Sequence, residues 1–387
     1  MGHNILREYD PTVAFDEPFT LEEWLNLGYL EDVNARPNNL TYPIHPALDF
    51  RKWALTSPPL TASDREVMEP ALRLASALLM SPASITFMHT LIYDRRELVN
   101  DSRTKKKLEV LPEPLRYNKE LRSRVEYFLN MAHKHCEYTW RDEKAGPPEW
   151  AAAEMIYAYT QPFWLDKVPN YGYGSAIRVN SRFLESLHLL NAAPLSTRIL
   201  NHQLRLQLLL AVTLCHELMH ALETARNPER EALEPYWGDQ ALNELGLAWE
   251  DVIFNGNLTE VMRDGMNANN YKIGEWPLTF CHFPAPHWFP GLVDDPNLGE
   301  AILDRKPAKG SFTTYFVPME WLSNIQQQAS WDRCVRSNST ALCYIPRNEG
   351  YQLLNNSWEV DPNWSPAQSS EGRWPGDERG RVFRNRA

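Results

Sequence analysis

The chain has 387 residues, so we expect either one large catalytic unit with accessory helices or two closely packed lobes. Its 50 acidic residues outnumber its 39 basic ones, and the net charge of -11 leaves no basic face for nucleic acid. The five cysteines contain no CxxC pair, which argues against a disulfide framework and against a cysteine zinc cluster. We therefore predict a protein of a reducing compartment without a nucleic-acid partner.

The N-terminal region resembles neither a secretory signal nor a membrane anchor. Its first residues, MGHNILREYDPTVAFDEP, are polar and acidic, and we find no later apolar run long enough to span a bilayer. These features predict a cytoplasmic protein without a membrane partner. The stretch TLEEWLNLGYLED (Thr20–Asp32) predicts a short helix capped by Thr20.

Four further segments carry a clear periodicity. Residues 63–79 and 120–139 have the spacing of packing helices, and residues 175–180 alternate as a short strand does. The leucine-rich residues 196–224 are apolar around most of a helical circumference, which predicts a central helix.

The motif HELMH lies in the C-terminal half of this leucine-rich helix, and its spacing suits a metal ion. Residues four apart lie about 40° apart around a helix axis, so His216 and His220 project from one face and can bind one ion. Glu217 is turned by about 100° from His216, toward the position of a general base acting on a metal-bound water. Because these groups would be costly to bury without partners, we predict metal binding.

A third protein ligand is expected downstream. A break after Asn227 ends the first helix, and the periodic stretch from Gln240, QALNELGLAWEDVIF, predicts a second helix that returns along the first. Glu244 lies at the height where this helix would pass His220, and Glu250 is the next candidate, as a ligand or as a carboxylate that orients a histidine. The other acidic residues considered are Glu223, Glu229, Glu231 and Glu234.

The pattern His216-Glu217-x-x-His220, followed by Glu244, resembles the gluzincin metallopeptidases, which are zincins with two histidines and a downstream glutamate as ligands. The similarity covers about residues 175–256, and HExxH is its specific signal. It implies a zinc ion bound by the two histidines and Glu244, and a peptide or amide substrate.

Three further features bear on this resemblance. Gluzincins align the substrate along an edge strand, for which Ser175–Asn180 is our candidate. The spacing from His220 to Glu244 is longer than in the best-known members. Ala248 stands where they often carry an aspartate that orients a histidine, so Asp251 or Glu250 is expected to replace it.

The resulting prediction is a zinc-dependent metallopeptidase in which Glu217 takes a proton from metal-bound water. Tyr315 is our candidate for stabilising the oxyanion, with His282 and His287 as alternatives. Two histidines and a carboxylate also suit iron(II) in an oxygenase. The third hypothesis is a non-catalytic protein in which the metal only holds a binding lobe together. Glu217 argues against this hypothesis, because a structural metal needs no general base there.

The expected fold is α+β and predominantly helical, with a zincin-like catalytic core, a small sheet and accessory helices. We predict a helical N-terminal lobe over residues 1–165 and the metal-binding core over residues 166–270. A helical and aromatic lobe over residues 271–363 and a flexible tail over residues 364–387 would follow.

Overall fold

Helices dominate the described part of the chain, which confirms a predominantly helical α+β fold. The computed structural model describes residues 32–53, 59–94, 96–99, 107–110, 116–141, 157–168, 172–227, 234–237, 244–261, 279–283, 310–337, 342–346, 349–355 and 381–384. The α-helices are α2 (Ala62–Leu79), α3 (Pro82–Tyr93), α4 (Lys119–Ala132), α6 (Arg182–Ala192), α7 (Thr197–Arg226), α8 (Leu245–Phe254), α9 (Met319–Asn324) and α10 (Gln328–Ser337). Short 3-10 helices are η2 (Pro46–Leu48), η3 (Phe50–Trp53) and η4 (His133–His135).

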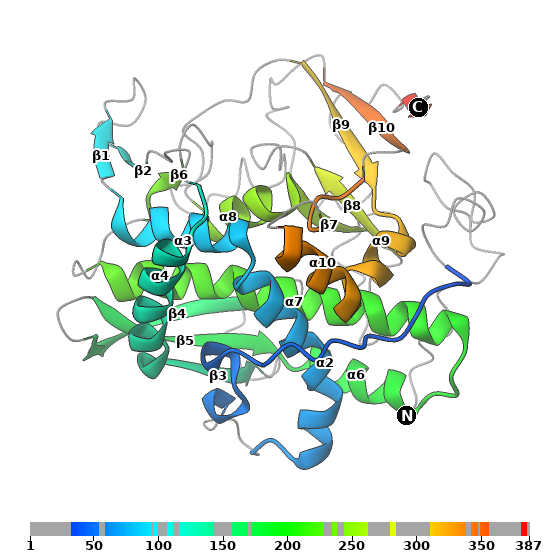
Figure 1. The fold of residues 1–387 in the computed structure, drawn as a ribbon, viewed down its shortest axis with the longest axis horizontal. Helices are drawn as coiled ribbons and strands as arrows, with labels where there is room; N and C mark the ends of the chain where they lie inside the picture. The colour runs from blue at the N-terminus through cyan, green and yellow to red at the C-terminus, as the bar shows by residue number, and fades with distance from the viewer. Residues whose placement is uncertain are drawn as a thin grey trace, which may run out of the picture.

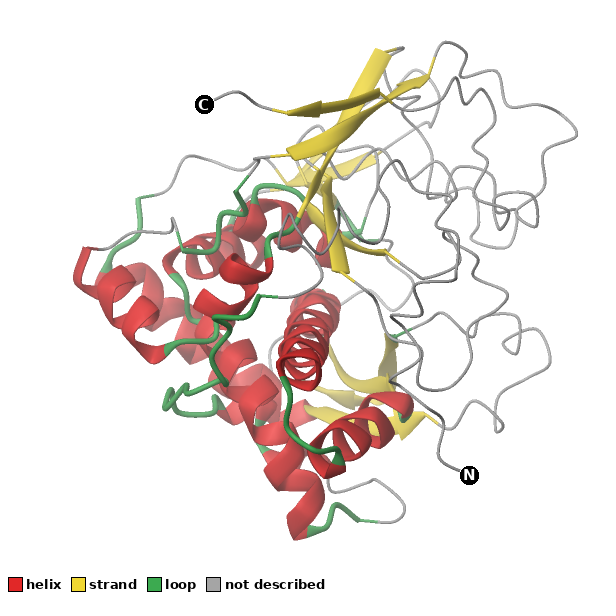
Figure 2. Cartoon of the chain, turned by 90° about the vertical axis from the view of Figure 1, so that its right-hand side faces the viewer, coloured by secondary structure: helices red, strands yellow, loops and turns green. Residues whose placement is uncertain are grey.

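The strands form three small sheets. The strands are β1 (Arg96–Val99), β2 (Lys107–Val110), β3 (Cys136–Arg141), β4 (Ala158–Lys167), β5 (Tyr173–Asn180), β6 (Tyr236–Trp237), β7 (Asn257–Val261), β8 (Thr279–Phe283), β9 (Gly310–Phe316), β10 (Glu349–Asn355) and β11 (Arg381–Arg384). Their orders are β1-β2-β6, β3-β5-β4 and β11-β10-β9-β8-β7. The last sheet is separated from the β3-β5-β4 sheet by the helical layer (Figures 1 and 2).

Helix α7 is the centre of the fold, as its all-round apolar sequence predicts. It begins at the cap residue Ser196, whose side chain accepts the amide hydrogen of Ile199, and it continues for 30 residues. The helix contacts α2 and α6, and it lies between β4 and β5 on one side and α8 on the other (Figure 1). Because its neighbours surround it, nearly every side chain in its middle is buried.

Burial explains a second property of α7. It is long and apolar enough to cross a membrane by length and composition, contrary to our reading of the sequence, but 83% of its most apolar stretch is buried inside the fold. The bent pair α2 and α3 passes the same test when it is counted as one span. A buried core helix needs the same composition.

Helix α2 packs along α7 with a close polar contact inside the apolar core. It begins with a capping box in which Thr61 and Asp64 satisfy each other's backbone amides, which confirms the helix predicted over residues 63–79. The thiol of Cys215 on α7 donates a hydrogen bond to the carbonyl of Ala75 on α2 at 3.3 Å. Burial raises the pKa of this thiol.

The strand predicted over residues 175–180 is confirmed as β5, but it is not an edge strand. It pairs with β3 in parallel, Ile177 opposite Tyr138, and with β4 antiparallel, Ile177 opposite Thr160. With partners on both sides, β5 is the middle strand, and β3 and β4 are the two outer strands of this sheet. Burial on both faces fits this position, because the adjacent residues Ala176 and Ile177, which point to opposite faces, are both buried.

Two other helix predictions need comment. The helix expected over residues 120–139 ends at Ala132 as α4, and the chain then turns through η4 into β3. Helical periodicity misled the prediction here because Tyr138 and Trp140 belong to a strand that packs both rings against Trp53, the first stacked and the second tilted. The helix expected over Thr20–Asp32 lies outside the described residues, except for Asp32.

The N-terminal segment (residues 32–42) crosses the N-terminal half of α7 and is held by side-chain amides. The Asn38 amide donates to the side-chain oxygens of Gln207 and Gln326, each at 3.1 Å. Gln326 in turn donates to the carbonyl of Leu204 at 2.8 Å. This cluster of three amides therefore connects the N-terminal segment, α7 and the region after α9.

One hydrophobic core joins residues from the first three predicted lobes. It includes Leu48 from the N-terminal region, Leu214 from α7 and Leu322 from α9, all fully buried. The lobe boundaries themselves stay predictions.

Candidate metal site

The two histidines of HELMH face the same way from α7. Their rings lie with centroids 5.2 Å apart and side chains about one-fifth exposed, although the helix around them is buried. The four-residue spacing produces this arrangement directly, because α7 is regular through the motif. His216 and His220 therefore present two imidazoles side by side at the surface of a core helix.

Glu244 completes the group, but from a different position than the sequence suggested. It caps α8 instead of lying one turn inside a helix that starts at Gln240, because α8 begins at Leu245. Its Oε1 lies 3.1 Å from Nε2 of His216 and 2.5 Å from Nε2 of His220. Its Oε2 accepts the amide hydrogen of Leu247, so the helix end fixes the carboxylate.

The three side chains form a group that could hold one metal ion, with their donor atoms within 4.8 Å of one another. Zinc binds imidazole nitrogen at about 2.0–2.1 Å and carboxylate oxygen at about 2.0–2.2 Å, so two ligands of a tetrahedral site lie about 3.3 Å apart. The His216 distance is close to this value, and the His220 distance is shorter by less than one ångström. A small outward movement of Glu244 would therefore accommodate an ion.

Both histidines are oriented by a carboxylate on the other ring nitrogen. Nδ1 of His216 lies 2.8 Å from Glu250, and Nδ1 of His220 lies 2.6 Å from Glu234. A proton on Nδ1 that is donated to a carboxylate leaves the Nε2 lone pair free for a metal. Of the two roles left open for Glu250, the geometry matches the orienting one, while Glu244 is the residue that reaches both Nε2 atoms.

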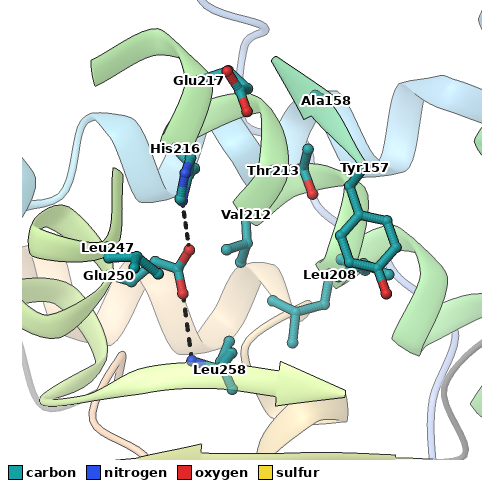
Figure 3. Close-up of a pocket in the computed structure, with 11 residues that line it drawn as sticks. Tyr157, Ala158, Leu208, Val212, Thr213, His216, Glu217, Leu247, Glu250 and Leu258 are labelled. Atoms are coloured by element: carbon teal, nitrogen blue, oxygen red, sulfur yellow. Dashed lines mark hydrogen bonds and ion pairs between the residues drawn. The ribbon is translucent and has the colours of Figure 1, made fainter. Parts of the chain in front are cut away.

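The orienting carboxylates are themselves fixed by backbone amides. Glu234 accepts the amide hydrogen of Leu245 at 3.2 Å. Glu250 accepts the amide hydrogen of Leu258 at 3.4 Å, as Figure 3 shows. Helix α8 thus receives carboxylates from Glu234 and Glu244 at its N-terminus, where its dipole favours negative charge. The contacts that cap α8 also set the positions of the groups around the two histidines.

Gly246 lets α8 approach His216 closely enough for these contacts. A Cβ atom at this position would lie 2.2 Å from Cδ2 and 2.3 Å from Nε2 of the His216 ring. Two carboxylates hold that ring, so it cannot easily swing away. The absence of a side chain at Gly246 is therefore a geometric requirement of this site.

Charge couples the three groups strongly. Burial disfavours the charged form of His216, but Glu244 and Glu250 outweigh burial and raise the pKa of the imidazole well above its usual range. Glu234 and Glu244 act on His220 in the same way, again against burial. Burial opposes ionisation of Glu244 too, yet the two histidines hold its pKa well below the usual value. The surplus of carboxylates therefore favours added positive charge at this site.

Glu217 leaves α7 in a different direction from His216 (Figure 3). Its side chain is buried, and its Oε2 accepts a hydrogen bond from the hydroxyl of Thr160 on β4 at 2.8 Å. The same hydroxyl lies 2.9 Å from the backbone carbonyl of Glu217. Edge strand β4 thus holds the carboxylate that the motif assigns to proton transfer.

A cavity of about 250 Å³ adjoins both His216 and Glu217 (Figure 3). It extends along α7 toward its N-terminus, and its walls are mostly aliphatic. The lining residues are Tyr157, Ala158, Leu208, Leu209, Val212, Thr213, His216, Glu217, Leu247, Glu250 and Leu258. The arrangement joins a polar end, with the imidazole and two carboxylates, to an apolar chamber.

The structure does not place the remaining candidate residues from the sequence in the group of His216, His220 and Glu244. Tyr315 and His282 lie opposite each other in the backbone register of β9 and β8. His287 lies outside the described residues. Glu223 forms a buried ion pair with Arg96 on β1.

Sequence reasoning did not identify Thr160 and did not select Glu234. Glu234 was one of several downstream acidic residues, and nothing in its spacing distinguished it from its neighbours. Thr160 lies 57 residues before Glu217 in a segment to which no element was assigned. Its contact depends on how β4 packs on α7, for which the sequence carries no local signal.

No family model, curated protein or solved structure matches the chain. The geometry of the His216, His220 and Glu244 group is therefore the basis for inferring a function.

Proposed function

We propose that the protein is a zinc-dependent hydrolase of the HExxH type that cleaves a peptide or amide bond. The observation that carries this proposal is the convergence of both Nε2 atoms of HELMH on one oxygen of Glu244. Two histidines and one carboxylate are a ligand set of catalytic zinc sites, which keep a further position open for water. A zincin-like core around α7 is part of the same proposal.

In this function the zinc ion would supply an acidified water and polarise the substrate carbonyl. His216, His220 and Glu244 would hold the ion, while Glu250 and Glu234 keep both imidazoles in the tautomer that binds it. Glu217 would accept the water proton and later return it to the leaving amine, as general base and then general acid. The role of Tyr315 as oxyanion donor remains part of the proposal.

The cavity beside His216 and Glu217 supports a substrate with an apolar group next to the cleaved bond. Its walls of leucine, valine and alanine side chains would exclude water around such a group. Strand β4 borders the same cavity through Ala158 and lies at the edge of its sheet. It therefore replaces β5 as our candidate for the strand that aligns an extended substrate.

The test combines metal analysis with a peptide-library digest on one preparation. We expect one zinc per chain by mass spectrometry and cleavage that depends on it. Glu217→Gln should keep the metal while lowering the hydrolytic rate about 10²–10⁴-fold, because it removes the proton acceptor but no ligand. Unchanged hydrolysis in Glu217→Gln would remove this residue from the mechanism.

The same experiment separates the competing functions. Oxygen consumption by the iron(II)-loaded protein, without peptide cleavage by the zinc form, would favour an oxygenase, since two histidines and a carboxylate also bind iron(II). A bound metal with neither activity would favour a metal-stabilised binding protein.

A further inference from the structure

Thr160 contacts the general-base candidate Glu217 from outside the HExxH motif. It lies on β4, opposite Ile177 of β5 in register, and its side chain is half-buried against α7. Its hydroxyl lies within hydrogen-bond distance of two oxygens of one residue, Oε2 and the backbone carbonyl of Glu217, at 2.8 and 2.9 Å. A single side chain from the edge strand thus contacts the carboxylate to which we assign proton transfer.

A hydroxyl has one hydrogen, so it donates to one of these oxygens at a time. The carbonyl of Glu217 lies inside α7, where the amide four residues later already donates to it. The ionised carboxylate is the stronger acceptor, because charge-assisted hydrogen bonds are shorter and roughly twice as strong as neutral ones. The hydrogen therefore goes to Oε2, which leaves Oε1 as the oxygen for a second partner.

We propose that Thr160 is a positioning residue that fixes the Glu217 carboxylate, so that one oxygen stays bound to β4 and the other serves the reacting water. This inference rests on the proposed hydrolytic function. A terminal carboxylate rotates broadly about its last torsion, and a hydrogen bond from a rigid strand restricts that rotation. Thr160 is not one of the three candidate metal ligands, and it acts through Glu217.

Three substitutions separate positioning from packing. Thr160→Val keeps the shape of the side chain but removes the hydroxyl, and Thr160→Ser keeps the hydroxyl but removes the methyl group. Thr86→Val is the matched control, because the hydroxyl of Thr86 likewise lies within hydrogen-bond distance of two oxygens, the backbone carbonyls of Pro82 and Ala83 on α3. All four proteins are loaded with zinc, and metal content, melting temperature, kcat and KM are measured on a peptide that the wild type cleaves.

Positioning predicts a specific pattern. Thr160→Val should lower kcat about 10- to 100-fold, with KM changed by less than about threefold and one zinc retained per chain. Thr160→Ser should recover most of the loss, and Thr86→Val should leave kcat unchanged. An unaltered kcat in Thr160→Val, or an equal loss in Thr160→Ser, would overturn the proposal, because the methyl group and not the hydroxyl would then matter.

A second readout tests the inference without hydrolysis. Acetohydroxamic acid binds a metal while giving its proton to an adjacent base, and its binding to the cobalt(II)-loaded protein can be followed by visible absorption. We expect Thr160→Val to weaken this binding about tenfold and Thr160→Ser to leave it nearly unchanged. If the wild type cleaves no peptide, the proposed hydrolase fails, and this titration still decides the role of Thr160: equal affinity in Thr160→Val overturns it.

Discussion

The two halves of α7 each carry a buried or half-buried polar cluster, and the clusters differ in charge. At the N-terminal half, Gln207 joins Asn38 and Gln326 in a cluster of neutral amides. At the C-terminal half, His216 and His220 meet the carboxylates of Glu234, Glu244 and Glu250. The first cluster provides donors and acceptors from the protein alone, while the second contains more carboxylates than imidazoles.

Because of this difference in charge, we expect the first cluster to hold segments together and the second to bind an ion. A neutral amide cluster is satisfied at any pH at which the protein folds, so it holds segments together without a ligand. A cluster of carboxylates around two imidazoles needs added positive charge to balance it, from protons or from a metal cation. Removing one amide should therefore change stability, and removing one member of the second cluster should change ion binding.

The largest expected effect is the loss of metal in His216→Ala and His220→Ala. Each removes one of three expected ligands, so metal affinity should fall by at least about 100-fold, more than for a residue that only orients a ligand. Gln207→Leu is the control at the other end of α7, and it should lower the free energy of unfolding by about 1–3 kcal/mol while metal affinity stays the same. Isothermal titration with zinc and urea unfolding measure the two quantities. Stoichiometric metal in both alanine variants would contradict the site.

A smaller effect is expected from Glu234→Gln. The substitution keeps the size of the side chain but removes the charge that holds Nδ1 of His220, so zinc affinity should fall about 10- to 100-fold. Competition with a chromophoric chelator measures this change. Equal affinity in the variant would mean that the backbone around His220 alone fixes its ring.

Gly246→Ala tests whether close approach of α8 is required. The added methyl group would overlap the His216 ring and should cost about 1–3 kcal/mol of stability, as overpacked sites do. The cost should disappear when the same substitution is made in His216→Ala, where the ring is absent. Unfolding of the four proteins of this double-mutant cycle measures the coupling, and additive effects would show that the ring is not the obstacle.

The smallest effect concerns pH in the metal-free protein. Because the pKa values of His216 and His220 are raised in the folded state, their contribution to stability is complete below about pH 6.5 and is lost as pH rises through the folded pKa values. We expect the chelator-treated protein to lose about 1–3 °C of melting temperature from pH 6.5 to 8 relative to His216→Ala. Zinc should reverse the trend, since deprotonated imidazoles bind it better. A parallel pH profile in both proteins would contradict the coupling.

The sequence predicted the elements whose signals are local. The periodicity of α2 and α7 and the alternation of β5 extend over enough residues to identify each element alone. The HELMH spacing fixes the relation between His216 and His220 for the same reason, since both lie on one regular helix. Glu244 was selected correctly as the residue near both rings, although from an incorrect helix start.

The rest of the site depends on contacts between distant segments. The start of α8 is set by two carboxylates that cap it, one of them on Glu234, and no periodicity encodes that arrangement. The place of β5 in the middle of its sheet depends on pairing with β4, in a segment to which the sequence assigned no strand. Thr160 could not be connected with Glu217 before that pairing was known. Register and packing, not propensity, decide these features.

The contact between Cys215 and Ala75 allows the opening of the core between α7 and α2 to be measured by chemical labelling. Cys215 precedes His216 in the chain, yet its thiol points to α2, and burial keeps it protonated. A maleimide can therefore label it only in molecules in which α2 and α7 have separated. After digestion, the rate at which the Cys215-containing peptide becomes labelled thus measures how often the native state opens transiently. If bound metal lowers this labelling rate, the ion stabilises the packing of α2 against α7 and not the surface of α7 alone.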